Sequence, residues 1–169
     1  RGNGDDQEFD WKFPGIGIFD MQTLGGEVQQ SLWIGARNRI IAGVDYRRDD
    51  VDIDNVTGPI NEDNSVAGIY IQDELLVNDA VTITLGIRND HDDDFGDELS
   101  PRVAGLWRHS ANGEIFASFN LAHRAPALSD RFFVGEFDGR VFEGNPDLDP
   151  ETLKAYAVGA RQRGDSGIE

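Results

Sequence analysis

An alternation of apolar and polar residues with a period of two runs through most of this 169-residue chain. In the segment 81–88, Val81, Ile83, Leu85 and Ile87 are separated by hydroxylic, small or basic residues. Successive side chains of a β-strand point to opposite faces, so this pattern predicts a strand with one apolar face. The pattern recurs and predicts about seven strands, at residues 27–34, 40–47, 67–72, 81–88, 102–108, 114–121 and 155–161.

The connections between these segments alternate between short and long. Residues 35–38, 77–79 and 110–113 are short connections, whereas 49–63, 92–98 and 123–152 are longer. In an up-and-down antiparallel sheet, alternate connections lie at the same end. We therefore predict tight turns at one end of the sheet and large loops at the other. Aspartate and glutamate are concentrated in the longer connections, so the acidic charge is expected at the loop end.

Two all-β architectures fit the alternation. A soluble β-sandwich buries its apolar faces between two sheets, whereas a transmembrane β-barrel turns them toward lipid. The apolar faces keep one phase over roughly ten residues, longer than the ~5–6 of a typical globular strand. No apolar stretch approaches the ~20 residues of a membrane-spanning helix. Pattern alone leaves both architectures open.

Composition excludes several classes of function. The chain has 15 Lys and Arg against 32 Asp and Glu, a net charge of −17, and no Cys. Nucleic-acid binding needs clustered basic residues, and disulfide frameworks and iron–sulfur clusters need Cys. The three histidines, His91, His109 and His123, stand isolated, and we find none of the common zinc-protease, serine-hydrolase, phosphate-loop or dinucleotide motifs. We predict that the protein is not an enzyme.

Several segments resemble the barrel domain of TonB-dependent outer-membrane receptors. The segment 66–90 is similar to a strand–turn–strand of that family that carries Tyr70, Gln72-Asp73-Glu74, Gly86, Arg88 and Asp90. The segments 123–130 (HRAPALSD) and 144–152 (GNPDLDPET) resemble two further family motifs, in the same order. This chain departs from the usual pattern at His123, where Phe is common, at Asp149, where Lys is frequent, and at Ala157, where Glu is common.

The resemblance implies an all-β fold, an antiparallel up-and-down transmembrane β-barrel segment of about seven strands with long loops on one rim. The family's barrel has about 22 strands, more than this chain supplies. We therefore expect residues 1–169 to be a partial barrel. The plug domain, the signal peptide and the C-terminal strands are expected to lie outside this sequence.

The resemblance also implies a bacterial outer-membrane receptor for TonB-energised uptake of a scarce solute, with an iron–siderophore as the first expectation. Its expected partners are outer-membrane lipid and lipopolysaccharide, its own plug domain, the TonB–ExbB–ExbD complex and a small-molecule ligand. Two alternatives are a small closed outer-membrane barrel with an adhesin or structural role and a soluble carbohydrate-binding β-sandwich. Trimming the loop 123–152 should weaken ligand binding more than membrane insertion.

Two groups of loop residues are candidate sites. Ligand-binding candidates on the longest loop are Arg124, Arg131, Arg140 and Asn145. A speculative site for a divalent cation comprises Asp49, Asp50, Asp52 and Asp54, because carboxylates are hard oxygen ligands. These aspartates lack the spacing of an EF-hand, so a solvated acidic loop is the alternative. No other cofactor is expected.

The alternation assigns further side chains to faces. Arg88, Arg102 and Arg108 fall on the face that we assign inward, where pairing with carboxylates is favoured over binding an anionic ligand. Four aromatic residues are expected outward near strand ends, as in the aromatic girdles of outer-membrane barrels: Trp33, Tyr46, Trp107 and Tyr156.

Overall fold

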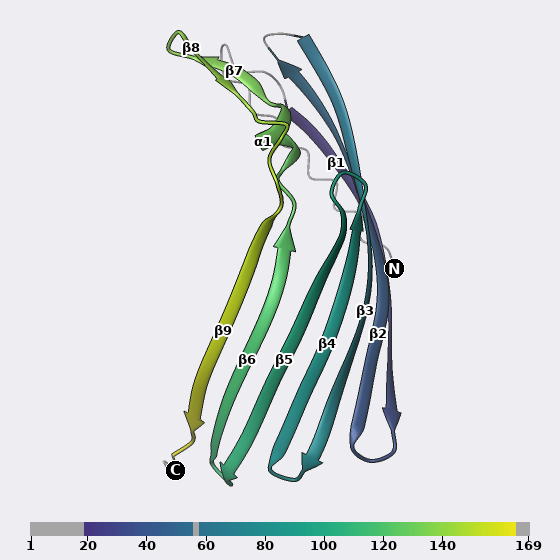
Figure 1. The fold of residues 1–169 in the computed structure, drawn as a ribbon, viewed down its shortest axis with the longest axis vertical. Coiled ribbons are helices and arrows are strands. Elements are labelled where there is room, and N and C mark those ends of the chain that lie inside the picture. The colour runs from purple at the N-terminus through teal and green to yellow at the C-terminus, as the bar shows by residue number, and fades with distance from the viewer. Residues whose placement is uncertain (1–18, 56–57, 165–169) are drawn as a thin grey trace, which may run out of the picture.

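Seven antiparallel strands form one curved sheet in the computed structural model, which describes residues 19–55 and 58–164 (Figure 1). The sheet order β1-β2-β3-β4-β5-β6-β9 follows the chain, so this part of the molecule is an up-and-down meander. The strands are β1 (Phe19–Ile34), β2 (Asn38–Asn55), β3 (Gly58–Asn78), β4 (Val81–Asp92), β5 (Gly96–Ser110), β6 (Gly113–Arg124) and β9 (Glu151–Gln162). The prediction of seven antiparallel strands is confirmed.

The strand register places apolar residues in rows across one face of the sheet. Val44 lies opposite Ile69, and Ile71 lies opposite Ile87. Side chains on this face remain open: Leu85 is 52% exposed and Val158 is 82% exposed. A sandwich would bury these residues against a second sheet, so the β-sandwich alternative is wrong for the described chain. An uncovered apolar face is what a sheet in contact with lipid requires.

The opposite face carries most of the polar side chains and the small buried core. Val51 and Ile53 on β2 are 2% and 1% exposed, and they pack against Leu128 from the long loop. We call the face of β2 with Val51, Ile53 and Asp45 the inner face, and the apolar face the outer face. Register places Tyr46, Trp107 and Tyr156 on the outer face, as predicted.

The prediction that Trp33 points outward is wrong. Trp33 lies opposite Arg39, and the Arg39 guanidinium donates to the Ser31 hydroxyl on the same face, 3.0 Å away. Side chains two apart on one strand share a face, so Trp33 belongs with Ser31 on the inner face. Residues 32–34 are apolar on both faces of the strand, and the outer residues among them are Leu32 and Ile34.

The predicted loop 49–63 is also largely wrong, because β2 and β3 continue as a paired hairpin. Asp50 lies opposite Asp63, and Ile53 lies opposite Ile60. Val51 and Ile53 keep the alternation going between the aspartates, but the density of charge concealed it. The predicted connection 92–98 likewise shortens to residues 93–95, where the Asp92 carboxylate accepts the backbone N–H groups of Asp94 and Phe95 at 2.9 and 3.2 Å.

The long connection 123–152 is folded. It contains the short helix α1 (Leu128–Phe132) and a hairpin of β7 (Val134–Phe137) and β8 (Arg140–Glu143), none of which we predicted. The hairpin turns at Asp138 and Gly139, both with positive φ, as a tight two-residue turn requires. The Gly144 N–H donates to the Phe133 carbonyl at 2.8 Å and closes the base of the hairpin.

The two ends of the sheet differ, as predicted. The tight turns after β1, β3 and β5 lie together at one end, and the β2–β3 hairpin and the α1 segment lie at the other (Figure 1). The contact of Leu128 with Val51 and Ile53 brings the long loop from β6 back across the inner face to β2. Across the described residues, none of the helical segments is long and apolar enough to cross a membrane.

Candidate functional site: a polar cleft on the inner face

A cleft of about 730 Å³ opens on the inner face below the α1 segment. Strands β1 to β5 form its wall, and the chain from the end of β6 to α1 borders it. Its charged and amide-bearing lining residues are Asp45, Arg47, Asp49, Asn64, Arg88, Asp90, Asp92, Glu98, His123 and Arg124. The cleft therefore lies on the inner face at the loop end of the sheet, bordered by the chain that leads into α1.

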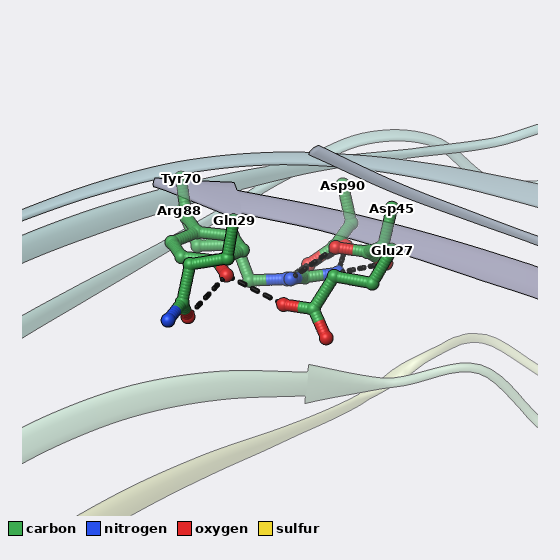
Figure 2. Close-up of polar contacts among 6 residues, drawn as sticks. All are labelled: Glu27, Gln29, Asp45, Tyr70, Arg88 and Asp90. Carbon is green, nitrogen blue, oxygen red and sulfur yellow. Dashed lines mark hydrogen bonds and ion pairs between the residues drawn. The ribbon is translucent and has the colours of Figure 1, made fainter. Parts of the chain in front are cut away.

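Arg88 is the centre of a polar network in the wall of the cleft (Figure 2). Its two terminal nitrogens donate to the two carboxylate oxygens of Asp45, at 2.7 and 2.8 Å. Its Nε donates to Asp90 at 2.9 Å. The guanidinium also lies 5.7 Å from the centre of the Tyr70 ring. The prediction that Arg88 points inward and pairs with carboxylates is confirmed.

Glycine in the sheet makes this reach possible. Asp45 on β2 lies opposite Gly68 on β3, and Gly68 lies opposite Asp90 on β4. A Cβ at Gly68 would collide with the Arg88 guanidinium and lie 2.7 Å from the Asp45 carboxylate. Absence of a side chain at Gly68 therefore lets Arg88 pass over β3 from β4 to β2.

Tyr70 likewise passes over a glycine of the neighbouring strand, one row away from Gly68. Its ring covers Gly43 on β2, and its hydroxyl reaches two side chains of β1 (Figure 2). The hydroxyl oxygen lies 2.5 Å from Glu27 Oε1 and 2.8 Å from Gln29 Oε1. Tyr70 thereby ties β3 to β1 across the intervening strand.

We expect Gly43→Ala to lower the free energy of unfolding, because the displaced Tyr70 would lose its hydrogen bonds to Glu27 and Gln29. The added Cβ would lie 2.5 Å from the Tyr70 Cζ and Oη atoms. Urea unfolding of the receptor in detergent measures the effect. Gly105→Ala is the matched control, because its Cβ meets nothing within 4 Å. An equal response of both variants would contradict the role of Tyr70.

A second polar group lies nearer the loop end. Asp49 accepts from the Thr23 hydroxyl at 2.8 Å and pairs with Arg47 at 3.1 Å. The Asn64 amide donates to Asp92 at 3.1 Å. The cleft edge at β5 and β6 is held by His123 Nδ1 and Glu98 Oε2, which are 3.0 Å apart. These contacts fix most of the carboxylates in defined positions before any ligand arrives.

The outer face beside the cleft is also acidic. Asp97, next to Glu98 on β5, accepts from the Asn89 amide at 3.2 Å and contacts His91 at 3.1 Å. These two contacts hold the pKa of the Asp97 carboxyl below its ordinary value. Asp97 is exposed and belongs to the opposite face from Glu98, because adjacent strand residues alternate.

The structure separates the four predicted ligand-binding residues. Arg124 lines the cleft, whereas Arg140 is exposed at the start of β8. Arg131 pairs with Asp94 and lies over the Phe95 ring, 5.0 Å from its centre, so it holds the loop in place. Asn145 shapes the backbone: its N–H donates to Asp130, and its side-chain oxygen accepts from the N–H of Asp147.

The four predicted metal ligands do not converge. Asp49 is buried on the inner face, whereas Asp50, Asp52 and Asp54 alternate onto the outer face of the same strand. Asp49 and Asp50 are each engaged by an arginine, Arg47 and Arg48 respectively. Within residues 19–55 and 58–164, no group of three or more His, Asp or Glu side chains is placed to hold a metal ion.

Sequence reasoning missed most of the Arg88 network, namely Glu27, Gln29, Asp45, Tyr70 and Asp90 as partners. A usable signal was present. Glycine interrupts two strands at Gly43 and Gly68, each within two residues of a polar side chain on the same face. Glycine inside a strand often marks the close approach of another group.

Comparison with known proteins supports the architecture. The family described as "TonB dependent receptor-like, beta-barrel" matches residues 2–168. The siderophore receptor PirA from Pseudomonas aeruginosa superposes on 88% of the chain, with a TM-score of 0.71 and 19% identity, and 29% of that receptor is covered. The ferric enterobactin receptor PfeA of the same organism, in a mutant form, gives a TM-score of 0.70 at 19% identity, with 88% of the chain and 25% of that receptor covered. At such identities the likeness concerns the fold.

Two curated relatives are similar in sequence. A heme/hemopexin utilization protein C from Haemophilus influenzae is 28% identical over 75% of the chain, and an iron-regulated outer membrane virulence protein from Vibrio cholerae is 34% identical over 49%. The aligned regions amount to 21% and 13% of those proteins, so the chain spans a small part of their length. The chain therefore belongs to the TonB-dependent receptor β-barrel family of the bacterial outer membrane.

Proposed function

We propose that the whole protein takes up a ferric siderophore across the outer membrane. The observation that carries this proposal is the cleft on the inner face at the loop end of an otherwise lipid-compatible sheet. A closed barrel would place this cleft inside the lumen, in the path of a solute that enters between the loops. The names of the relatives, which include siderophore receptors and an iron-regulated protein, support iron as the cargo.

In this proposal the chain supplies capture and guidance rather than chemistry. The α1 segment and the β2–β3 hairpin would receive the ligand. In the wall of the cleft, Arg88 would hold the carboxylates of Asp45 and Asp90 in fixed positions. A plug domain would obstruct the lumen, and the TonB–ExbB–ExbD complex would supply energy to move it. The apolar outer face would contact lipid, with lipopolysaccharide beside the acidic outer residues. The extent of the family match favours this receptor over a small closed adhesin barrel.

Haem is a second candidate for the cargo. The Haemophilus influenzae relative, named for heme/hemopexin utilization, is similar over 75% of this chain. Both candidates share the cleft and differ in the iron compound that it receives. A growth experiment separates them.

We expect deletion of the full gene to abolish growth of its bacterium in iron-depleted medium when one particular ferric siderophore is the sole iron source. Haem or ferrous iron should restore growth if a siderophore is the cargo. Loss of growth on haem alone would support the second candidate. Unimpaired growth and unimpaired uptake of labelled iron on every source would contradict the proposed function.

Shortening the β7–β8 hairpin tests whether the loop contributes to ligand binding separately from assembly of the barrel wall. Because the Gly144 N–H and the Phe133 carbonyl are hydrogen-bonded, residues 134–143 can be replaced by two glycines with little strain. We expect the shortened receptor to reach the outer membrane at its normal level and to bind ligand several-fold more weakly. Heat-modifiable migration on gels measures assembly, and fluorescence titration measures binding. Equal loss of both would show that the hairpin serves folding alone.

A further inference from the structure

The cleft is lined by more carboxylates than guanidinium groups, so its hydrogen-bond acceptors outnumber its charged donors. This excess favours some ligand charges over others. Building on the uptake proposed above, we infer that this wall receives a solute that presents positive charge or hydrogen-bond donors, and that it disfavours strongly anionic chelates. Three features of the wall point to this preference: a row of carboxylates, the engagement of the arginines and an unused acceptor in Asn64.

Four carboxylates lie in one row across five strands. Register pairs Glu27 with Asp45, Asp45 with Gly68, Gly68 with Asp90 and Asp90 with Glu98. Neighbouring strands lie about 4.8 Å apart, so the row presents negative charge at short intervals along the wall. Arg88 enters this row over Gly68 and neutralises its two central members. At the two ends of the row, Glu27 accepts from the Tyr70 hydroxyl and Glu98 contacts His123 through one oxygen, and no arginine of the described residues is paired with either. Of these two, Glu98 lines the cleft.

The arginines of the cleft are largely committed. Arg88 uses its Nε and both terminal nitrogens on Asp45 and Asp90, so it cannot offer a bidentate fork to an anionic ligand. Arg47 pairs with Asp49. Within the described part of the chain, Arg124 at the cleft border has no carboxylate partner. Five carboxylates line the cleft against three guanidinium groups.

Asn64 gives independent evidence of the same preference. Its side chain lines the cleft, the residue is 8% exposed, and its amide nitrogen is already used on Asp92. Its Oδ1 atom is buried with no hydrogen-bond partner among the described residues. A buried acceptor without a partner is costly, so the site favours a group that brings an N–H or O–H to it.

The test uses the full-length receptor and three ferric chelates that differ in net charge. A linear trihydroxamate with a free amine is positively charged, a cyclic trihydroxamate is uncharged, and a tricatecholate is strongly negative. We expect the first two to bind the wild-type receptor at least about tenfold more tightly than the third, measured by fluorescence quenching. Charge separations within the cleft are short enough for such a difference.

Charge reversal at adjacent residues provides the matched control. Glu98→Lys adds positive charge inside the cleft, and Asp97→Lys makes the same change on the outer face of the same strand. We expect E98K to weaken the positive chelate by about tenfold and to strengthen the negative one, and D97K to leave both unchanged. Glu98→Gln should act in the same direction by about threefold, which guards against misfolding of E98K.

Two outcomes would overturn the inference: tightest binding of the tricatecholate to the wild-type receptor, or equal responses of E98K and D97K. Either leaves the uptake proposal intact, because a chelate is still bound. Failure of the wild-type receptor to bind any chelate or haem, together with normal growth of the deletion strain, would instead remove the proposed function itself.

Discussion

Replacing Arg88 by leucine is expected to lower the free energy of unfolding by about 2 kcal/mol. The substitution leaves Asp45 and Asp90 facing each other across Gly68 without their shared cation. Breaking a fully buried ion pair costs about 3–5 kcal/mol, and the lower figure here allows for solvent screening. About a third of the Arg88 side chain is exposed, 34%, with 26% for Asp45.

A matched arginine on the other face provides the control. Arg48 also contacts two carboxylates, Asp50 and Asp63, but all three side chains are well exposed. Exposed ion pairs contribute little to stability because water and salt screen them, so Arg48→Leu should change the unfolding midpoint in urea only slightly. Gly68→Ala should approach the effect of Arg88→Leu without removing a charge, because its Cβ displaces the guanidinium. Similar losses for Arg88→Leu and Arg48→Leu would show that the inner network carries no special weight.

Leu128→Ala is expected to release the α1 segment from the sheet. Leu128 is the buried residue of α1 in the cluster with Val51 and Ile53, against which Phe132 and Phe133 also pack. Truncating a buried leucine costs about 2–5 kcal/mol. We expect amide hydrogens of residues 125–148 to exchange at least about thirtyfold faster in the native receptor, while those of β2 to β5 keep their rates. Ligand affinity should fall with the loss of the ordered loop.

The reciprocal variant and a surface variant sharpen this test. Ile53→Ala removes the other side of the same contact, so it should also accelerate exchange of the α1 segment. The double variant should add little, because residues in contact are not additive. Val141→Ala in β8 alters a side chain that is 64% exposed and should change nothing. Unchanged exchange in Leu128→Ala would mean that the ion pair of Arg131 with Asp94 suffices to hold the loop.

The apolar outer face was predicted correctly and the loop 49–63 was not, although both segments follow the same alternation of residues. The outer residues Ile83, Leu85 and Ile87 are separated by one residue each, because successive side chains of a strand point to opposite faces. The extension of β2 through Val51 and Ile53 follows the same alternation, but the four aspartates of the segment 49–54 resemble a solvated loop. This extension pairs with β3 along its length, and Leu128, from a distant part of the chain, packs against Val51 and Ile53.

Sequence by itself determined the existence of the seven strands of the main sheet, their antiparallel order, its apolar outer face and the inward direction of Arg88, because a period of two needs only neighbouring residues. The tertiary structure alone decided which partners Arg88 and Tyr70 reach, that Asp49 is separated from Asp50, Asp52 and Asp54, and that the long loop folds back onto β2. These features depend on the register between strands and on glycines that leave room above the sheet. The register between strands, and the distance that a side chain spans across a neighbouring strand, exist only once the strands are paired. The sequence of a single segment therefore does not specify them.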